Sequence, residues 1–322
     1  MKQKFVFLSF VLLGLLAGCS IAPIYAPDAQ PIETGRLPVP DKTVTVPDLG
    51  PCTDAPDQTL HLNSNHPVTV LVHGCDGSAG RFRSLAQLYA FNGQQAVCFS
   101  YDDRVSLTRT SDRLITALDN LSRQTGNRNI NVIGHSMGGL IARKAMERER
   151  SSKWTQKDID FNLVTVSAPL GGIKVARDCG NSVLHWATLG VLPGLCWMVS
   201  GDNWYEITSH SKFIQQPGPL LSSVHRYIKV VTDERNACRR RNNDGSCLDD
   251  DYIFSLPEQY QSTIDNYSNL TNVEVKAGHV EIVGDSNSAP RKLLSILQSQ
   301  GLLALTPPER KVAFERLLAE LY

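Results

Sequence analysis

The chain has 322 residues, and its 32 Lys and Arg side chains balance its 32 Asp and Glu side chains, so the formal net charge is zero. A chain of balanced charge without a basic stripe is a poor match for a nucleic-acid partner. Residues 66–322 are enough for one large α/β domain with an insertion.

The first residues predict a processing signal rather than part of the fold. Lys2 and Lys4 precede an apolar run over 5–16. This run is shorter than the roughly 20 residues that a membrane-spanning helix needs. The sequence Leu-Ala-Gly-Cys that ends at Cys19 resembles a bacterial lipobox, in which the cysteine is diacylated and becomes the mature N-terminus. We therefore predict a lipoprotein signal peptide over 1–18; the alternative is a plain secretory signal with a chance cysteine.

Lipidation would hold the protein at the bacterial cell envelope, because acyl chains on Cys19 contribute about 0.8 kcal/mol per buried CH₂. By the same resemblance, Ser20 permits sorting to the outer membrane, facing the periplasm. Residues 19–65 are rich in Pro, Asp and Thr, and they predict a tether that leads into edge strands over 43–46 and 59–62.

The chain contains eight cysteines, and secretion would place the seven that follow Cys19 in an oxidising compartment. The odd number leaves one thiol without a partner, for which we choose Cys75. We predict three disulfides, two chosen for proximity in the sequence and the third a guess: Cys179 with Cys196, Cys238 with Cys247, and Cys52 with Cys98.

Buried strands alternate with amphipathic helices from Val68 onward. Strands are predicted over 68–73, 96–101, 130–133, 161–167, 227–232 and 273–276, and helices over 83–90, 111–125, from about 291, and in the tail at 307–322. Ser111 is expected to cap the second helix and Gly126 to end it. The alternation predicts a mostly parallel central sheet flanked by helices, with ligands bound beyond the carboxyl ends of the strands.

A Gly-x-Ser-x-Gly motif, Gly134–Gly138, separates the strand at 130–133 from the helical pattern that follows. In this context the motif predicts a nucleophile elbow, a turn so tight that glycines flank the serine. Ser136 would stand at the carboxyl end of the strand, with the N–H of Met137 directed at a developing oxyanion. The alternative is an ordinary strand-to-helix turn, which does not explain a serine between two glycines.

The strand from Val68 ends in His73 and Gly74 and continues into a loop of small residues. Loops of this kind supply the second oxyanion N–H in α/β-hydrolases. Gly74 or Cys75 is therefore predicted to donate together with Met137, unless this is a simple β–α loop.

Three motifs together resemble the lipase branch of the α/β-hydrolases: His73-Gly74, Gly134–Gly139 and Ser167–Gly172. The nearest parts of that branch are the GPI-inositol deacylases and the bacterial triacylglycerol lipases. The resemblance covers about residues 66–300 and implies an α/β-hydrolase fold over 66–322 with a lid insertion at 172–221. The apolar residues of the insertion either pack beneath a loop or form a cap that accepts acyl chains.

An acyl-transfer serine needs a histidine to take its proton and an acid to orient that histidine, in the chain order Ser, acid, His. His279 ends a predicted strand and is the predicted base. For the acid we prefer Asp250, then Asp251, then Asp233. The first two lie in an acidic run that resembles the Asp-Gly-x-Val element of lipases, although the glycine is missing, and Asp233 directly follows a strand. The run could also be solvated or hold a structural Ca²⁺.

These features predict a serine carboxylic-ester hydrolase of the lipase or esterase type, with an acyl-enzyme intermediate, no cofactor and no catalytic metal. The expected partners are an ester or lipid substrate and the membrane, and we expect a monomer. Two alternatives stay open: an acyltransferase that uses the same triad, and a non-catalytic envelope lipoprotein that binds lipid or a partner. The natural substrate, its acyl-chain length and its head group do not follow from the sequence.

Overall fold

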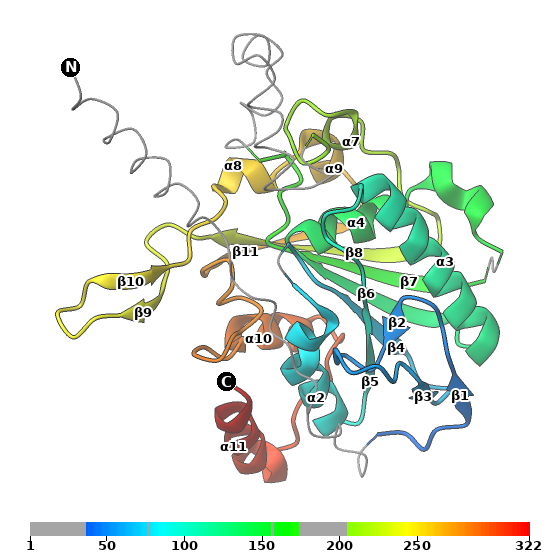
Figure 1. Ribbon diagram of the computed structural model, residues 1–322, viewed down its shortest axis with the longest axis horizontal. Helices are drawn as coiled ribbons and strands as arrows, with labels where there is room; N and C mark the ends of the chain where they lie inside the picture. Colours follow the sequence, from blue (N-terminus) through cyan, green and yellow to red (C-terminus); the bar gives the residue numbers. More distant parts are fainter. Residues whose placement is uncertain (1–36, 76, 156–157, 174–204) are drawn as a thin grey trace, which may run out of the picture.

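A twisted seven-stranded sheet forms the centre of the computed structural model, which describes residues 37–75, 77–155, 158–173 and 205–322 (Figure 1). In spatial order the strands are β11 (Leu270–Lys276), β8 (Val224–Asp233), β7 (Asp160–Val166), β6 (Asn129–His135), β4 (Val68–Val72), β5 (Gln95–Phe99) and β2 (Leu49–Gly50). All neighbours pair in parallel except β2, which runs antiparallel to β5 at the edge. The predicted mostly parallel sheet is therefore confirmed.

Helices cover both faces of this sheet (Figure 1). One face is covered by α3 (Leu107–Thr125) and α4 (Met137–Ala145), and the other by α2 (Arg83–Phe91), α10 (Arg291–Ser299) and α11 (Lys311–Leu321). The tail helix α11 buries Phe314 and Leu318 against the domain, and the ring of Phe314 lies 5.5 Å from that of Phe91. The prediction that the tail packs on the domain is confirmed.

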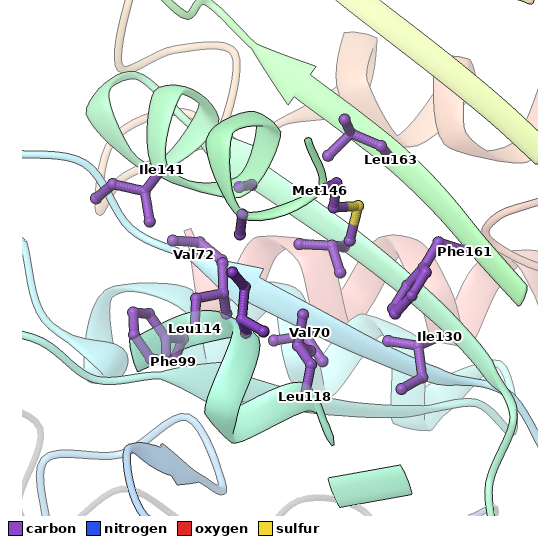
Figure 2. Packing of buried hydrophobic residues seen from close by; sticks show 14 of the residues in the cluster. Val70, Val72, Phe99, Leu114, Leu118, Ile130, Ile141, Met146, Phe161 and Leu163 are labelled. Carbon is purple, nitrogen blue, oxygen red and sulfur yellow. The ribbon is translucent and has the colours of Figure 1, made fainter. Parts of the chain in front are cut away.

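Strands covered on both faces need apolar side chains on both faces, which explains their continuous apolar sequences. All five residues of β4 are buried, as are Ile130, Val132 and Ile133 of β6. Figure 2 shows the packing on the α3–α4 side, where Leu114 and Leu118 of α3 meet Val70 and Val72 of β4.

Helix α3 begins one turn earlier than its sequence pattern predicts. Ser106 is the N-cap, and its side chain accepts a hydrogen bond from the N–H of Arg109. The expected cap, Ser111, lies inside the helix and donates to the carbonyl of Leu107 at 2.7 Å. The prediction that Ser111 caps the helix is therefore wrong. A serine hydroxyl can bind the backbone either as an N-cap or from inside a helix, so the residue type alone does not mark the first turn. Gly126 does end the helix, with φ at 75°.

Several short elements extend this core. They are the antiparallel pair β1 (Lys42–Val44) and β3 (Leu60–Leu62), the ribbon of β9 (Cys238–Arg241) and β10 (Cys247–Asp250), the turns η1 (Ala79–Phe82), η2 (Arg148–Lys153) and η5 (Pro308–Arg310), and the short helices α7 (Lys212–Gln215), α8 (Leu256–Gln259) and α9 (Ser262–Asp265). The β9–β10 ribbon projects away from the sheet beside the end of β11 (Figure 1).

The predicted lid insertion at 172–221 is described only at its two ends. Ile173 and Thr208 form a parallel bridge, so the ends lie side by side. Near the second end, Glu206 accepts the N–H of Leu107 at 2.6 Å and that of Thr108 at 3.3 Å at the start of α3. The apolar residues expected to cap the site lie in 174–204, outside the described residues.

Two of the three predicted disulfides are present, Cys52–Cys98 and Cys238–Cys247. Cys75, the residue predicted to stay unpaired with another cysteine, is exposed and takes part in neither bond. The predicted pair Cys179–Cys196 and the lipidation residue Cys19 lie outside the described residues. In the described part of the chain, no helix has the length and apolar character that a membrane crossing requires.

The two disulfides are expected to contribute unequally to stability. Cys52–Cys98 joins residues 46 positions apart and both half-cystines are fully buried, whereas Cys238–Cys247 joins residues 9 positions apart on the exposed ribbon. Loop-closure entropy predicts a loss of about 4 kcal/mol in the free energy of unfolding for Cys52→Ala/Cys98→Ala and about 2.5 kcal/mol for Cys238→Ala/Cys247→Ala. Urea unfolding of the two double variants measures both, and an equal or reversed order would contradict this expectation.

Candidate active site

Five parallel strands bring Gly74, Ser136 and His279, which the sequence predicts, to one edge of the sheet together with residues that it does not predict. Because β4, β6, β7, β8 and β11 are parallel neighbours or near neighbours, the residues that follow them meet at their carboxyl ends. These residues are Gly74 after β4, Ser136 after β6, Ser167 after β7, Glu234 after β8 and His279 after β11. Positions more than 200 residues apart in sequence are joined here by sheet topology alone.

Ser136 occupies a strained backbone conformation between β6 and α4. Its φ is 54°, in the left-handed region that L-residues rarely adopt, and the side chain is buried. Such a conformation costs of the order of 1–3 kcal/mol and persists only where the surroundings enforce it. Here the N–H of Ser136 donates to the carbonyl of Val166 at 2.9 Å, and its own carbonyl accepts from Gly139 at 3.0 Å.

The flanking glycines are required by close backbone packing. A Cβ on Gly134 would lie less than 3.0 Å from the carbonyl of Gly138, and one on Gly138 would lie equally close to the carbonyls of Val72 and His73. Strand β6, helix α4 and the end of β4 therefore touch backbone to backbone. This is the geometry that the Gly-x-Ser-x-Gly motif predicts for a nucleophile elbow.

The loop after β4 lies against Ser136, the place that the sequence predicts for an oxyanion loop. A Cβ on Gly74 would lie 2.8 Å from Cβ of Ser136 and 3.4 Å from its Oγ. Gly74 thus allows the loop backbone to approach the serine, with Cys75 next to it. On the other side of Ser136, Met137 is the first residue of α4, so its N–H stands at the positive end of the helix dipole.

His73 fixes the start of the loop that follows β4. Its Nδ1–H donates to the carbonyl of Gly74 at 2.8 Å, and its ring stacks on Tyr101 with centroids 4.2 Å apart. The Tyr101 hydroxyl donates to the His73 carbonyl at 2.6 Å. Burial lowers the pKa of His73, so the ring stays neutral and serves as a fixed support.

His279 is held by a buried carboxylate that was not among the predicted acids, that of Glu234. Nδ1 of His279 lies 3.0 Å from Oε1 of Glu234, and the hydroxyl of Ser167 lies 2.9 Å from the same nitrogen. The edge of the Phe254 ring packs on the imidazole at a centroid distance of 4.8 Å. With Nδ1 donating to a carboxylate, the tautomer leaves Nε2 as the proton acceptor.

The carboxylate of Glu234 is fully buried and saturated with hydrogen bonds. Oε2 accepts the N–H groups of Ile253 and Phe254, both at 2.7 Å, and Oε1 accepts the hydroxyls of Ser167 at 2.7 Å and Thr232 at 2.9 Å. Burial by itself would raise the pKa of Glu234. The hydrogen bond and charge of His279, with the two backbone N–H groups, outweigh burial and hold the pKa below its ordinary value.

None of the three predicted acids contacts the imidazole of His279. Asp250 is exposed and accepts the N–H of Tyr252 at 3.2 Å. Asp233 points to the other side of its strand, where it pairs with Arg235 at 2.8 Å and Lys276 at 3.6 Å. Asp251 is buried but binds backbone N–H groups.

The choice of Asp250, with Asp251 and Asp233 as alternatives, is therefore wrong for the partner of the histidine. Strand alternation explains the case of Asp233, because Thr232 and Glu234 share one side of the chain and Asp233 faces the other. The signal that could have found Glu234 is its position next to the end of a buried strand, since this fold accepts Asp or Glu as the acid.

Ser136 and His279 are linked through two neighbouring residues. The carbonyl of Val166 accepts the N–H of Ser136. The next residue, Ser167, contacts His279 through its hydroxyl. His135, directly before Ser136, donates from Nε2 to the carbonyl of His279 at 2.9 Å, and the two rings lie 4.7 Å apart. Burial, together with the charge of His279, holds the pKa of His135 well below its usual range, so this ring stays neutral.

Within the described ranges, no group of three or more His, Cys, Asp and Glu side chains is arranged to hold a metal ion. The acidic run considered for Ca²⁺ is engaged otherwise: Arg239 lies 3.5 Å from Asp249 and 3.6 Å from Asp251.

Comparison with known proteins points to the same fold. The family profile of lecithin:cholesterol acyltransferase matches residues 82–178, which include the elbow. The solved structure of Bacillus licheniformis lipase BlEst2 in its mature form is 16% identical, with a TM-score of 0.51, and the match covers 79% of this chain and 97% of that one. The propeptide form of that lipase is also 16% identical, with a TM-score of 0.53, covering 80% of this chain and 53% of that one. No curated protein matches in sequence.

The depressed pKa of Glu234 predicts how stability depends on pH. A carboxylate with a folded pKa below its unfolded value, about 4.3, stabilises fully above that value and loses its contribution as the pH falls through the folded pKa. We expect the free energy of unfolding to fall on acidification below about pH 4.3, and Glu234→Gln to flatten that fall. Urea unfolding between pH 3 and 6 tests this, with the exposed Glu320→Gln as the control of equal charge change. Parallel curves for Glu234→Gln and Glu320→Gln would contradict it.

Proposed function

The chain has the α/β-hydrolase fold, as its sequence motifs predict, and we propose that it is a serine carboxylic-ester hydrolase of the lipase or esterase type. One observation carries the proposal: a serine on a strained elbow shares a sheet edge with a histidine bound to a buried carboxylate. Ser136 is the nucleophile, His279 the general base, and Glu234 the acid that orients the base. This constellation is the one that activates a hydroxyl for acyl transfer.

Acylation begins when Nε2 of His279 takes the proton of Ser136 as its Oγ attacks the ester carbonyl carbon. The imidazolium that forms is stabilised by Glu234, whose charge is already fixed by backbone N–H groups. Because the pair is preorganised, little rearrangement accompanies proton transfer.

The tetrahedral intermediate places a negative charge between α4 and the loop after β4. The N–H of Met137 and an N–H from Gly74 or Cys75 would bind this oxygen, and one such donor is worth on the order of 3 kcal/mol of activation free energy.

His279 then gives its proton to the leaving alcohol. Water, activated by the same histidine, attacks the acyl-serine, and the collapse of the second intermediate releases the acid and restores Ser136. No step requires a cofactor.

The similar lipase structures and the acyltransferase profile support esters as the substrate class. We further propose that the enzyme works at the bacterial cell envelope, anchored through acylated Cys19, where a lipid ester would be its substrate. The support for this location is the lipobox-like sequence that ends at Cys19.

An acyltransferase is the second candidate, because the profile that matches residues 82–178 is that of an acyltransferase family. The same acyl-serine would then pass its acyl group to an alcohol rather than to water. Product analysis with a lipid ester and an added acceptor alcohol separates the two: free fatty acid indicates hydrolysis, and a new ester indicates transfer.

The catalytic assignment predicts a graded response in a p-nitrophenyl ester series. Ser136→Ala and His279→Ala should each lower kcat by at least about 10⁴-fold, since triad members act as a unit. Glu234→Gln should lower kcat by about 10³- to 10⁴-fold, because a neutral amide neither fixes the tautomer nor stabilises the imidazolium.

Matched controls are the acids that do not contact the imidazole. Asp250→Asn and Asp233→Asn should each stay within about twofold of the unchanged enzyme, since Asp250 is exposed and Asp233 pairs with Arg235 and Lys276 away from the imidazole. Loss of turnover in either, with Glu234→Gln active, would overturn the assignment. A purely scaffolding protein would fail to react with a serine-directed phosphonate and would keep its cellular role in the Ser136→Ala variant.

A further inference from the structure

The loop that carries His279 is fastened to a second buried carboxylate, that of Asp251. The carbonyl of Asp251 accepts the N–H of His279 at 3.0 Å. Its carboxylate accepts the N–H of Val280 at 2.9 and 3.1 Å and the N–H of Glu281 at 2.9 Å. Three consecutive backbone N–H groups, beginning at the histidine itself, therefore end on this one residue.

Asp251 is closely enclosed by the backbone that it binds. Asp251 has 1% of its surface exposed, and a Cβ on Gly278 would lie less than 3.0 Å from its carboxylate. Glu281 closes the same turn from the other side by accepting the N–H of Gly278 at 2.9 Å. The backbone on both sides of His279 is thus set by carboxylates.

Arg239 supplies the positive charge that a buried carboxylate needs. Its Nε lies 3.6 Å from Asp251, and its terminal nitrogens lie 3.1 Å from Asp285 and 3.5 Å from Asp249. Burial raises the pKa of Asp251, while the backbone N–H groups and then the charges of Arg239 and His279 oppose that rise. Burial is the largest of these effects, so the pKa of Asp251 lies above its ordinary value.

The β9–β10 ribbon connects this carboxylate to the triad acid. Glu234 lies just before the ribbon and Asp251 just after it, and the N–H of Asp251 donates to the carbonyl of Ala237 at 3.2 Å across its base. The Cys238–Cys247 disulfide joins the two strands of the ribbon, and Cys238 directly follows Ala237. The two carboxylates that act on His279, one through its ring and one through its backbone, thus stand before and after one disulfide-closed hairpin.

We propose that Asp251, held by Arg239, is a positioning residue that fixes the backbone at His279 so that its ring reaches both Glu234 and Ser136. The proposal rests on the proposed function, in which His279 is the base. A displacement of about 1 Å in a catalytic group can cost about 100-fold in rate, so the loss of this support has a kinetic signature. Asp251 touches neither substrate nor reacting atoms and acts only through His279.

The test compares Asp251→Asn with its exposed neighbour Asp250→Asn, which makes the same change of charge one residue away. Asp251→Asn replaces one of the accepting oxygens by an NH₂ group, which cannot accept from Val280 or Glu281. We expect kcat on a p-nitrophenyl ester to fall about 10- to 100-fold with KM within about twofold, and Asp250→Asn to leave both unchanged.

A second pair of variants guards against misfolding of Asp251→Asn. Arg239→Gln removes the counter-charge but keeps the carboxylate, and should lower kcat by about 3- to 10-fold. Arg240→Gln is its control, because Arg240 is 59% exposed and approaches Asp249 only to 3.9 Å.

A readout that does not depend on turnover is the downfield proton resonance of the His279 Nδ1–H, assigned by its loss in His279→Ala. This signal should weaken through faster exchange in Asp251→Asn and persist in Asp250→Asn. Unchanged kcat and an unchanged resonance in Asp251→Asn, whatever happens to its Tm, would overturn the proposal. If the unchanged protein hydrolyses no ester, the proposed function fails, and the positioning of His279 by Asp251 is still decided by the resonance.

Discussion

The contact between the Glu234 carboxylate and the His279 imidazole is the constraint around which the rest of the site is arranged. A buried carboxylate is costly unless hydrogen bonds and an opposite charge compensate it. The compensating groups come from the end of β7, from Thr232 near the end of β8, and from the backbone at Ile253 and Phe254. Satisfying one side chain therefore draws three separate stretches of chain to the edge where Ser136 stands.

The features that the sequence predicts well are those set by local physics. A strand covered on both faces must be apolar throughout, so β4 and β6 can be recognised as continuous runs without knowledge of their neighbours. The glycines beside Ser136 also predict the tight turn from the sequence, because close backbone contact there excludes any Cβ. The position of His279 follows from the same logic, since a residue after a parallel strand reaches the common edge whatever the intervening sequence is.

The features that the sequence misses depend on which groups meet across the fold. Asp250 and Glu234 are both acidic residues near the end of a strand, and the sequence does not show which one will be buried against the imidazole. The choice is made by partners remote in sequence, such as Ser167, whose hydroxyl binds both Glu234 and His279. The predicted start of α3 is wrong for a similar reason. Glu206, about 100 residues away, accepts the N–H groups of Leu107 and Thr108 in the first turn of the helix.

The β9–β10 ribbon explains why a motif-based search for the acid fails here. The hairpin is inserted directly after Glu234, and the hydrogen bond from Asp251 to Ala237 closes it at the base, so its length does not alter where the flanking residues lie. The acidic run at its far end then resembles the acid loop of a lipase while the true partner of His279 precedes the hairpin. One of those acids is still needed, because the histidine requires its backbone as well as its ring to be held. Two carboxylates thus divide a task between them: Glu234 sets the tautomer and charge of the imidazole, and Asp251 sets its location.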